Sequence, residues 1–260
     1  MNILFIGDII GKPGRRIVRE LLYSVINKYQ VDFCIANTEN AASGFGVTQK
    51  VVQQLLDMGI DCLTSGNHIW DKKEVVEVLN LESRLLRPAN YPEATPGRSY
   101  GVFDSKGGHK IGVLNLQGRV FMTCIDCPFQ AAKRIVPIVK KSCKIVVVDI
   151  HAEATSEKMA MGWFLDGQVT AIVGTHTHVP TADAKILPKG TAYITDVGMT
   201  GPYDSIIGIK KDAALERFLT QVPQKFTIAK TDLSLNAVLI KCDTETGLAL
   251  GIERLQLPLG

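Results

Sequence analysis

The 260-residue sequence predicts an α/β fold with mixed sheets in one domain, residues 1–260. Short apolar runs of strand length alternate with segments whose apolar residues recur at helical spacing. Strand-like runs joined by turns follow, which adds antiparallel strands to the sheet. No Gly-, Ser- or Pro-rich linker, low-complexity tract or repeat interrupts this pattern. Nothing in the sequence therefore marks a domain boundary.

The first half of the chain predicts buried strands joined by helices. Residues 2–7 form a strand because Ile, Leu, Phe and Ile follow one another without polar alternation. Residues 15–29 form a helix because their apolar side chains fall on one stripe. Thr48 can cap a second helix that runs to residue 58. The other elements expected here are strands 31–36 and 61–65 and helix 72–79.

The pattern then changes to hairpins and further strands. Gly107 and Gly108 mark the turn of a hairpin between residues 99–103 and 110–116. A helix is expected over residues 129–141, although Pro137 weakens it. The remaining elements are strands 145–150 and 169–174, helix 156–165 between them, and strands 192–196, 225–228, 233–242 and 248–257.

The composition is that of an ordinary globular protein. Hydrophobic residues make up 46% of the chain and charged residues 21%, which excludes a disordered, collagenous or coiled-coil protein. The net charge is 29 − 26 = +3. A charge this small does not by itself imply nucleic-acid binding.

The sequence predicts a cytoplasmic protein. No apolar run approaches the roughly 18 residues of a membrane span, and Asp8 interrupts the stretch where a signal peptide would continue. Three of the six cysteines lie in or beside apolar runs, where a thiol behaves as a small hydrophobic group. Cys124 and Cys127 have CxxC spacing, but no second pair completes a zinc site. We therefore expect free thiols in a reducing compartment.

Polar side chains gather where the predicted strands end. The eight candidates are Asp8, Glu39, Asn40, Asn67, His68, His151, His176 and His178. Four of the five histidines in the chain are among them, so scattered structural histidines are a poor explanation. Because parallel strands carry their carboxyl ends to the same edge of a sheet, where ligands bind, we expect these side chains to meet in one site.

This set predicts a centre with two metal ions. Imidazoles with carboxylates and amide oxygens suit iron, manganese or zinc rather than calcium or magnesium. The candidates other than His68 are too many for one open catalytic ion and fit two, about 3.5–4 Å apart and bridged by a carboxylate. Two divalent ions minus the charges of Asp8 and Glu39 leave about +2, before a hydroxide binds. Such a surplus of positive charge favours a phosphate anion.

The order of these motifs resembles the calcineurin-like metallophosphoesterase superfamily. The motifs are Gly7-Asp8, Gly66-Asn67-His68, His151 and Gly174-Thr175-His176-Thr177-His178. Longer stretches are similar to the bacterial YmdB family of phosphodiesterases, at residues 4–8, 38–42, 65–71, 87–90, 115–119, 149–157 and 195–201. The resemblance implies the metallophosphoesterase fold, with two mixed β-sheets sandwiched between helices in four αββα layers. It also implies a metal-dependent phosphodiesterase whose substrates are small phosphodiesters, chiefly 2′,3′-cyclic and alternatively 3′,5′-cyclic nucleotides.

The resemblance further implies how the metals are held. One ion would be bound by Asp8, His178 and Asn40. The other would be bound by Asn67, His151 and His176, and Glu39 would bridge the two. Ile9 and Ile10 follow Asp8, whereas the superfamily usually has a histidine two residues after this aspartate. The loss of that imidazole favours iron or manganese over zinc.

The same resemblance implies a catalytic role for His68, which adjoins a ligand but is not a ligand in the superfamily. An imidazole titrates near neutrality, so His68 can protonate the leaving oxygen as a general acid. The nucleophile would be a hydroxide that bridges the two metals and attacks phosphorus in line.

Two other functions stay open at this point. One is a phosphomonoesterase of the nucleotidase type, and the other is a regulatory protein that binds nucleotide or RNA and turns over slowly. The complete ligand set weighs against an inactive site, and the small net charge weighs against extended RNA binding. The expected partner is a small nucleotide or phosphodiester, with no membrane and no stable nucleic-acid complex, and a homo-oligomer is compatible with the sequence.

Weaker signals flank these residues. Residues 11–14 are expected to support the turn after Asp8 rather than to bind phosphate. Residues 43–46 form either a rim beside the metals or a plain loop, and Arg119 contacts either phosphate or a surface carboxylate. Trp70 is expected to be a buried ring rather than a platform for a base. Asp196 is expected to orient a histidine ligand.

Overall fold

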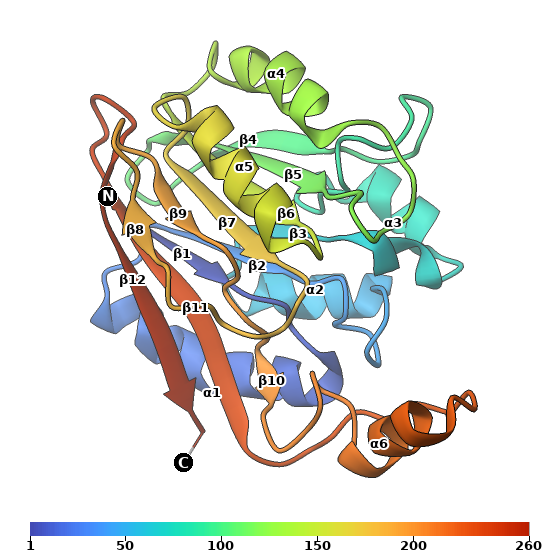
Figure 1. Ribbon diagram of the computed structural model, residues 1–260. Coiled ribbons are helices and arrows are strands. Elements are labelled where there is room, and N and C mark those ends of the chain that lie inside the picture. The colour runs from blue at the N-terminus through green and yellow to red at the C-terminus, as the bar shows by residue number, and fades with distance from the viewer. Residues whose placement is uncertain (260) are drawn as a thin grey trace.

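The computed structural model of the protein describes residues 1–259 and contains two six-stranded β-sheets (Figure 1). The first sheet consists of β1 (Asn2–Ile6), β2 (Phe33–Asn37), β3 (Cys62–Thr64), β10 (Gly201–Pro202), β11 (Leu233–Cys242) and β12 (Ala249–Pro258). The second consists of β4 (Tyr100–Asp104), β5 (Lys110–Gln117), β6 (Ile145–His151), β7 (Ala171–Thr175), β8 (Lys185–Ile186) and β9 (Ala192–Ile194). The helices are α1 (Gly11–Lys28), α2 (Gln49–Asp57), the 3₁₀ helix η1 (Asn67–Asp71), α3 (Val75–Leu81), α4 (Pro128–Val139), α5 (Thr155–Leu165) and α6 (Lys211–Thr220).

Each sheet mixes parallel and antiparallel strands. The first has the order β10–β11–β1–β2–β3, with β12 on β11; β1, β2 and β3 run parallel, and β11 runs antiparallel to β1. The second has the order β4–β5–β6–β7–β9–β8, and β5, β6, β7 and β9 run parallel. The α/β fold with mixed sheets predicted from the sequence is confirmed.

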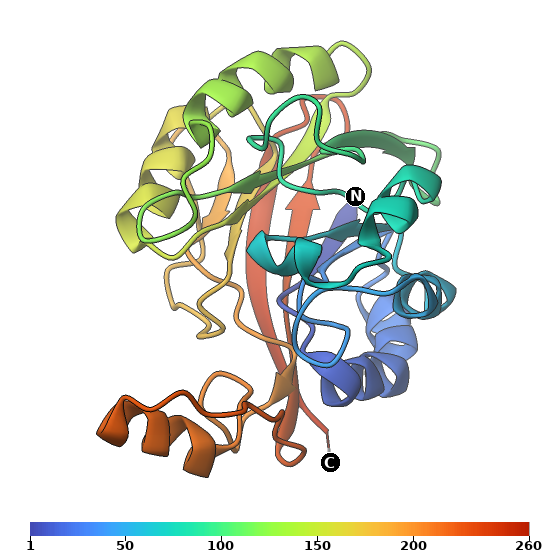
Figure 2. The same cartoon turned by 90° about the vertical axis from the view of Figure 1, so that its right-hand side faces the viewer.

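Helices cover the outer face of each sheet, so the molecule has four layers, which Figure 2 shows from the side. One apolar cluster joins α1, α2 and α3 to the first sheet. A second fills the space between the two sheets, and a third joins the second sheet to α4 and α5. This is the αββα order that the resemblance implied.

The alternation of side chains along a strand explains why the strands read as uninterrupted apolar runs. In β1, Leu4 and Ile6 pack in the helix-facing cluster, whereas Ile3 and Phe5 pack between the sheets. All four are fully buried. Burying each such side chain contributes about 1.5–3 kcal/mol, so both faces of the strand favour apolar residues.

The layer between the sheets becomes polar at the carboxyl ends of the strands. Asn37, Thr64, Asp149 and Thr175 continue the inward-facing alternation of β2, β3, β6 and β7, and all four are fully buried. Because a buried polar group is costly unless it is hydrogen-bonded, these four side chains must be paired with one another or with neighbours. The loops that carry the candidate site begin directly after them.

Several element boundaries differ from the sequence-based expectation. Helix α1 begins at Gly11 rather than at residue 15, because Pro13 lies in its first turn, where its missing N–H is not needed. The helix expected over 72–79 is α3, which begins at Val75 and ends at Leu81, and the 3₁₀ helix η1 that precedes it was not expected. The sequence patterns did not predict β8, β10 or α6.

The strand expected over residues 225–228 is wrong. Only Ile228 pairs there, in an isolated bridge with Ile209. The side chain of Ile228 instead occupies the space beside Gly11 and Gly44, where its Cδ1 lies 2.5 Å and 2.9 Å from the positions that a Cβ would take. The apolar character of this segment therefore serves packing against a loop rather than strand pairing.

Two further expectations concern the whole chain. None of the helices within residues 1–259 is both long enough and apolar enough to cross a membrane. All six cysteines are free thiols, including the pair at Cys124 and Cys127.

Candidate metal centre

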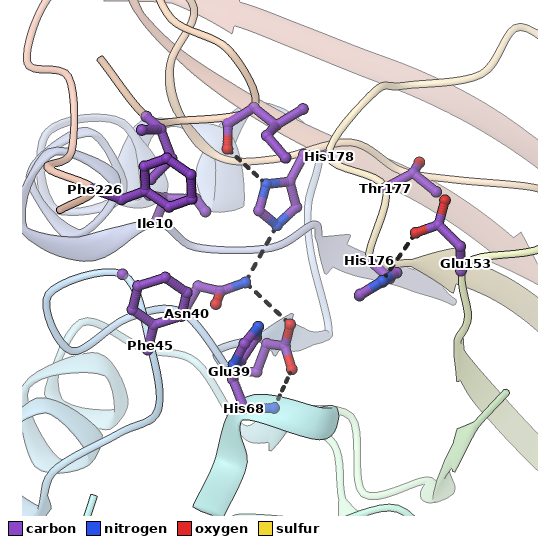
Figure 3. A pocket seen from close by; sticks show the side chains of 13 residues that line it. Ile10, Glu39, Asn40, Phe45, His68, Glu153, His176, Thr177, His178 and Phe226 are labelled. Carbon is purple, nitrogen blue, oxygen red and sulfur yellow. Dashed lines mark hydrogen bonds and ion pairs between the residues drawn. The ribbon is translucent and has the colours of Figure 1, made fainter. Parts of the chain in front are cut away.

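The predicted site residues converge at the carboxyl edge of the sheets. Asp8 follows β1, Glu39 and Asn40 follow β2, Asn67 and His68 begin η1 after β3, His151 ends β6, and His176 and His178 follow β7. A hollow of about 400 Å³ is lined by Glu39, Asn40, His68, His176 and His178, whose side chains Figure 3 shows. Asp8 and His151 are fully buried and join this group through direct contacts.

Glu39, His151 and His176 form the closest group. One donor atom from each lies within 4.8 Å of the other two. His151 Nε2 is 3.0 Å from Glu39 Oε1 and 3.0 Å from His176 Nδ1. Three electron-donating atoms so close together, on largely buried side chains, match the demands of a metal ion.

Buried hydrogen bonds fix the orientation of His151. Asp149 accepts hydrogen bonds from Thr175 Oγ1 at 2.8 Å, Asn37 Nδ2 at 2.9 Å and Thr64 Oγ1 at 2.5 Å. Because a carboxylate only accepts, the Thr175 proton points to Asp149, and Thr175 Oγ1 accepts in turn from His151 Nδ1 at 2.9 Å. The Nε2 atom of His151 therefore faces Glu39 and His176 and is the nitrogen that would bind a metal ion.

Two buried oxygens in the site have no hydrogen-bond partner within the described residues 1–259. They are Asp8 Oδ1 and Asn67 Oδ1. An unsatisfied buried acceptor costs about 1–3 kcal/mol, so such atoms are expected to face a cation. Asp8 Oδ1 lies 3.9 Å from His151 Nδ1, and Asp8 Oδ2 accepts from the backbone N–H of His176 at 3.2 Å. Carboxylate and amide oxygens beside imidazoles form a donor set that fits a transition metal.

Asn40 and His178 form the outer part of the site. Asn40 Nδ2 is 3.1 Å from Glu39 Oε1 and 3.2 Å from His178 Nε2, while His178 Nδ1 donates to the carbonyl of Ile207 at 2.9 Å. With its Nδ1 proton so engaged, His178 Nε2 also presents a lone pair. A half-turn of the Asn40 amide would bring its oxygen to the same side.

Burial and neighbouring charges raise the pKa values of some groups in the site and lower those of others. Burial raises the pKa of Asp8. Burial also opposes ionisation of Glu39, but the imidazole of His151 and then those of His68 and His176 lower its pKa to about 2. The pKa of His151 is raised to about 9, because Glu39, Asp8 and Asp149 outweigh its burial. Burial and the neighbouring His151 lower the pKa of His176 to about 3. Groups with pKa values driven apart in this way are typical of functional sites.

The loop that carries the last two histidines is strained and held by a buried ion pair. His176 and His178 have φ angles of 100° and 67°, which cost about 1–3 kcal/mol each for residues with a Cβ. Asp196 accepts from the backbone N–H of Thr177 at 3.1 Å, from its hydroxyl at 2.7 Å and from Lys158 Nζ at 2.6 Å. Asp196, which was expected to orient a histidine ligand, contacts neither imidazole directly and holds Thr177, the residue between the two histidines.

His176 has its own carboxylate partner. Its Nε2 lies 3.1 Å from Glu153 Oε2, as the dashed line in Figure 3 marks. Because Nε2 donates to this carboxylate, Nδ1 faces His151 with its lone pair. Glu153 was not among the predicted site residues.

His68 is held differently from the candidate ligands. Its Nδ1 is 2.8 Å from Asp71 Oδ2, three residues further along the chain, and its ring meets Phe45 edge-on at 4.9 Å between centroids. The backbone N–H of His68 donates to Glu39 Oε2 at 3.0 Å. The pairing with Asp71 was not predicted, because the sequence pattern did not indicate a helical segment at these residues; on η1 the i, i+3 spacing brings the two side chains together.

The sequence of this chain also matches a known protein family. The sequence profile of the family described as YmdB-like protein matches residues 4–255. The chain belongs to this YmdB-like family.

A curated relative and two solved structures are similar to this YmdB-like protein over nearly its whole length. The 2′,3′-cyclic-nucleotide 2′-phosphodiesterase of Bacillus subtilis (strain 168) is 48% identical over 255 residues, 98% of this chain and 96% of the relative. The crystal structure of a hypothetical protein from Thermus thermophilus matches with a TM-score of 0.93 at 43% identity and covers 99% of both chains. That of a novel phosphatase from Mycoplasma pneumoniae matches with a TM-score of 0.92 at 36% identity, over 99% of this chain and 93% of the other.

Gly66 leaves room for the close group, which gives a first prediction. A Cβ at Gly66 would overlap His151 Cδ2 and Glu39 Oε2. Gly66→Ala should therefore push both donors out of place and weaken metal binding by at least the roughly 10–100-fold that follows from disturbing the support of a ligand. Metal titration of the variant, followed by calorimetry, measures the change.

Gly251→Ala is the matched control, because a Cβ at Gly251 would meet nothing within 4 Å. It should bind metal as the unmodified protein does. If Gly66→Ala also binds metal with unchanged affinity, the donor atoms are not held where the structure places them.

The buried pair of Lys158 and Asp196 gives a second prediction. Both side chains are fully buried, so Lys158→Met leaves the carboxylate without its cation and should lower the free energy of unfolding by about 3–5 kcal/mol. Urea denaturation measures it. Lys211→Met, which breaks an exposed pair with Asp204, should change stability little. Equal losses in the two variants would contradict the role given to the buried pair.

The structure also shows where the residues that flank the site lie. Gly14 packs against the Thr200 carbonyl and Gly11 N–H donates to the Asn40 carbonyl, so these two glycines support the turn after Asp8. Gly44 and Phe45 line the hollow and form a rim. Trp70 meets Tyr91 edge-on at 5.3 Å and packs against the helix-facing core, so the ring that was expected to be buried is partly buried.

The salt bridge considered for Arg119 is not formed within residues 1–259, and its contact with phosphate stays a prediction. Its side chain makes no salt bridge with any residue in the described part of the chain, and it does not line the hollow. Its backbone N–H donates to Glu157 at 3.1 Å.

Proposed function

We propose that this YmdB-like protein is a metal-dependent phosphodiesterase that hydrolyses 2′,3′-cyclic nucleotides. The observation that carries the proposal is the convergence of donor atoms from Glu39, His151 and His176 beside a hollow of about 400 Å³. A hollow of this size accommodates a small molecule. The name of the Bacillus subtilis relative supports the substrate class, because its identity of 48% extends over 98% of the chain.

The proposed centre holds two metal ions. We assign Asp8, Asn40 and His178 to one ion, Asn67, His151 and His176 to the other, and Glu39 to both. The unpartnered oxygens of Asp8 and Asn67 support one oxygen ligand for each ion. We propose iron or manganese rather than zinc, because the set contains oxygen donors and imidazoles but no thiolate. When bound, such ions lower the pKa of water and neutralise charge on a phosphate.

His68 acts as the general acid in this proposal. Its Nδ1 is occupied by Asp71, so Nε2 is the nitrogen that can serve a substrate in the hollow. Water adds to phosphorus, the bond from phosphorus to O2′ breaks, and O2′ takes the proton from His68. The product is a nucleoside 3′-monophosphate.

The assay that tests this function compares 2′,3′-cyclic AMP with 5′-AMP on protein loaded with manganese or iron. We expect turnover of the cyclic diester and little release of phosphate from the monoester. Faster hydrolysis of 5′-AMP would instead support a nucleotidase. Full metal loading without turnover of either compound would support a binding protein with a regulatory role.

We place the protein in the cytoplasm. Six free cysteines, four of them buried, are compatible with a reducing compartment.

A further inference from the structure

A second hollow adjoins the one beside the metal ligands. It has a volume of about 420 Å³ and is lined in part by Lys12, Lys210, Lys230 and Phe226. Phe226 lines both hollows, and Figure 3 shows its ring at the border of the metal hollow beside Ile10. Lys12 and Lys230 also line a third, smaller hollow with Arg16. The three hollows therefore follow one another from the metal site along the N-terminal end of α1.

Every charged residue that lines the second and third hollows is a lysine or an arginine. No Asp or Glu of the described chain lines either of them. Lys12, Lys210 and Lys230 are exposed and form no ion pair with any residue from 1 to 259, whereas Arg16 pairs with Glu20. Three uncompensated ammonium groups around one groove attract an anion with several charges.

The start of helix α1 adds to this positive charge. Lys12 lies in the first turn of α1, an 18-residue helix without an acidic residue in that turn or a side-chain N-cap. The partial positive charge of the helix start is therefore not neutralised. Phe226 is fixed at the junction, because the Arg217 guanidinium lies over its ring at 5.3 Å. A fixed aromatic ring between an anion groove and a phosphodiester site is suited to stacking a base.

We propose that this basic groove, defined by Lys12, Lys210, Lys230 and Phe226, binds the backbone of a single-stranded RNA whose 3′ end carries the 2′,3′-cyclic phosphate. The inference rests on the proposed function and names its substrate more narrowly. The terminal cyclic phosphate occupies the metal hollow, the last internucleotide phosphates lie along the lysines, and Phe226 stacks a base between them. The reaction is unchanged: water is added, the bond to O2′ breaks, and the strand ends in a 3′-phosphate.

The small net charge of the chain is compatible with this groove. A net charge of +3 is too small for a protein that coats nucleic acid, but three lysines at one place suffice to hold a short strand during one turnover. The upstream reaction must then be an RNA cleavage that leaves a 2′,3′-cyclic phosphate.

The test compares kcat/KM for 2′,3′-cyclic AMP with that for a tetraadenylate ending in a 2′,3′-cyclic phosphate, at low and at high salt. The unmodified protein should favour the oligonucleotide by about 10-fold or more at low salt and lose this preference as salt rises. Lys12→Gln, Lys210→Gln and Lys230→Gln combined should remove the preference and flatten its salt dependence. Hydrolysis of the mononucleotide should stay within about twofold, because none of the three lysines lines the metal hollow.

The matched control is the triple variant Lys133→Gln, Lys140→Gln and Lys141→Gln. These lysines are exposed on or just after α4, which lies at the other end of the molecule from α6 in Figures 1 and 2. It should behave as the unmodified protein does.

Each other outcome has a definite meaning. Equal kcat/KM for the two substrates in the unmodified protein, or a preference that survives in the groove variant, overturns the groove while leaving the phosphodiesterase intact. Loss of mononucleotide hydrolysis in the groove variant also overturns it, because the lysines would then act through the metal site. Absence of turnover of both substrates by metal-loaded protein overturns the proposed function itself.

Discussion

Replacing Glu39 by Gln is expected to abolish phosphodiesterase activity and to remove metal from the protein. Glu39 Oε1 is 3.0 Å from His151 Nε2 and 3.1 Å from Asn40 Nδ2, and Oε2 accepts from the backbone N–H of His68 at 3.0 Å. An amide of the same shape turns one of these acceptors into a donor and removes the negative charge. If Glu39 bridges two ions, neither keeps its full ligand set.

The expected loss in kcat/KM for 2′,3′-cyclic AMP is at least about 1,000-fold. A metal ion supplies several kcal/mol of transition-state stabilisation, and about 1,000-fold corresponds to about 4 kcal/mol. Elemental analysis of the same sample should show fewer ions per chain than in the unmodified protein. Circular dichroism checks that the variant is folded.

Glu153→Gln is the matched control for Glu39→Gln. Glu153 contacts His176 from the half-exposed side, at 3.1 Å, and supports a ligand without being assigned as one. Its loss should cost about 10–100-fold in activity. A Glu39→Gln protein that keeps both ions and a rate within about 10-fold of normal would refute the bridging assignment.

Replacing His68 by Ala is expected to leave both metals bound and to slow turnover by about 10²–10⁴-fold, the usual contribution of general acid catalysis. The reason is geometric: the His68 side chain is fixed by Asp71 and by the ring of Phe45 rather than by the close group of donor atoms. The loss should depend on the leaving group. Bis(p-nitrophenyl) phosphate releases a stabilised phenolate that needs little protonation, so its hydrolysis should suffer less than that of 2′,3′-cyclic AMP.

His151→Ala separates this role from ligation. His151 has one nitrogen engaged by Thr175 and the other beside Glu39 and His176. Its removal should deplete metal and slow both substrates alike. If His68→Ala also loses metal, or slows both substrates equally, His68 is not the general acid.

The candidate site residues could be predicted from the sequence because they follow directly on apolar runs. Glu39 and His176 stand just beyond strands whose two faces are both buried. The end of such a strand is recognised in the sequence by the change from a continuous apolar run to polar residues. The parallel order of the strands then brings these ends to one edge.

The buried residues that hydrogen-bond to the candidate ligands could not be predicted in the same way. Asp149 and Thr175 lie inside strands, at positions where the apolar pattern would predict another buried apolar side chain. A polar residue there is compatible with a solvent-facing position as much as with a buried hydrogen-bond network. Only the pairing of β6 with β7 and the stacking of the two sheets decide between the two.

The segment between β10 and β11 shows the opposite failure. Helix α6 has one buried residue, Ala214, so it lacks the apolar stripe that predicts a helix. Residues 225–228 have the composition of a strand, but Phe226 and Ile228 face the hollow and two glycines instead. In both cases contacts from distant parts of the chain outweigh the local pattern.

The number of metal ions that activates the enzyme tests the two-metal phosphodiesterase most directly. Metal-free protein is titrated with manganese under anaerobic conditions, while bound metal and the hydrolysis of 2′,3′-cyclic AMP are measured on the same samples. We expect two ions to bind per chain and activity to reach its maximum only when the second is bound. Full activity with one ion, or with none, would contradict it.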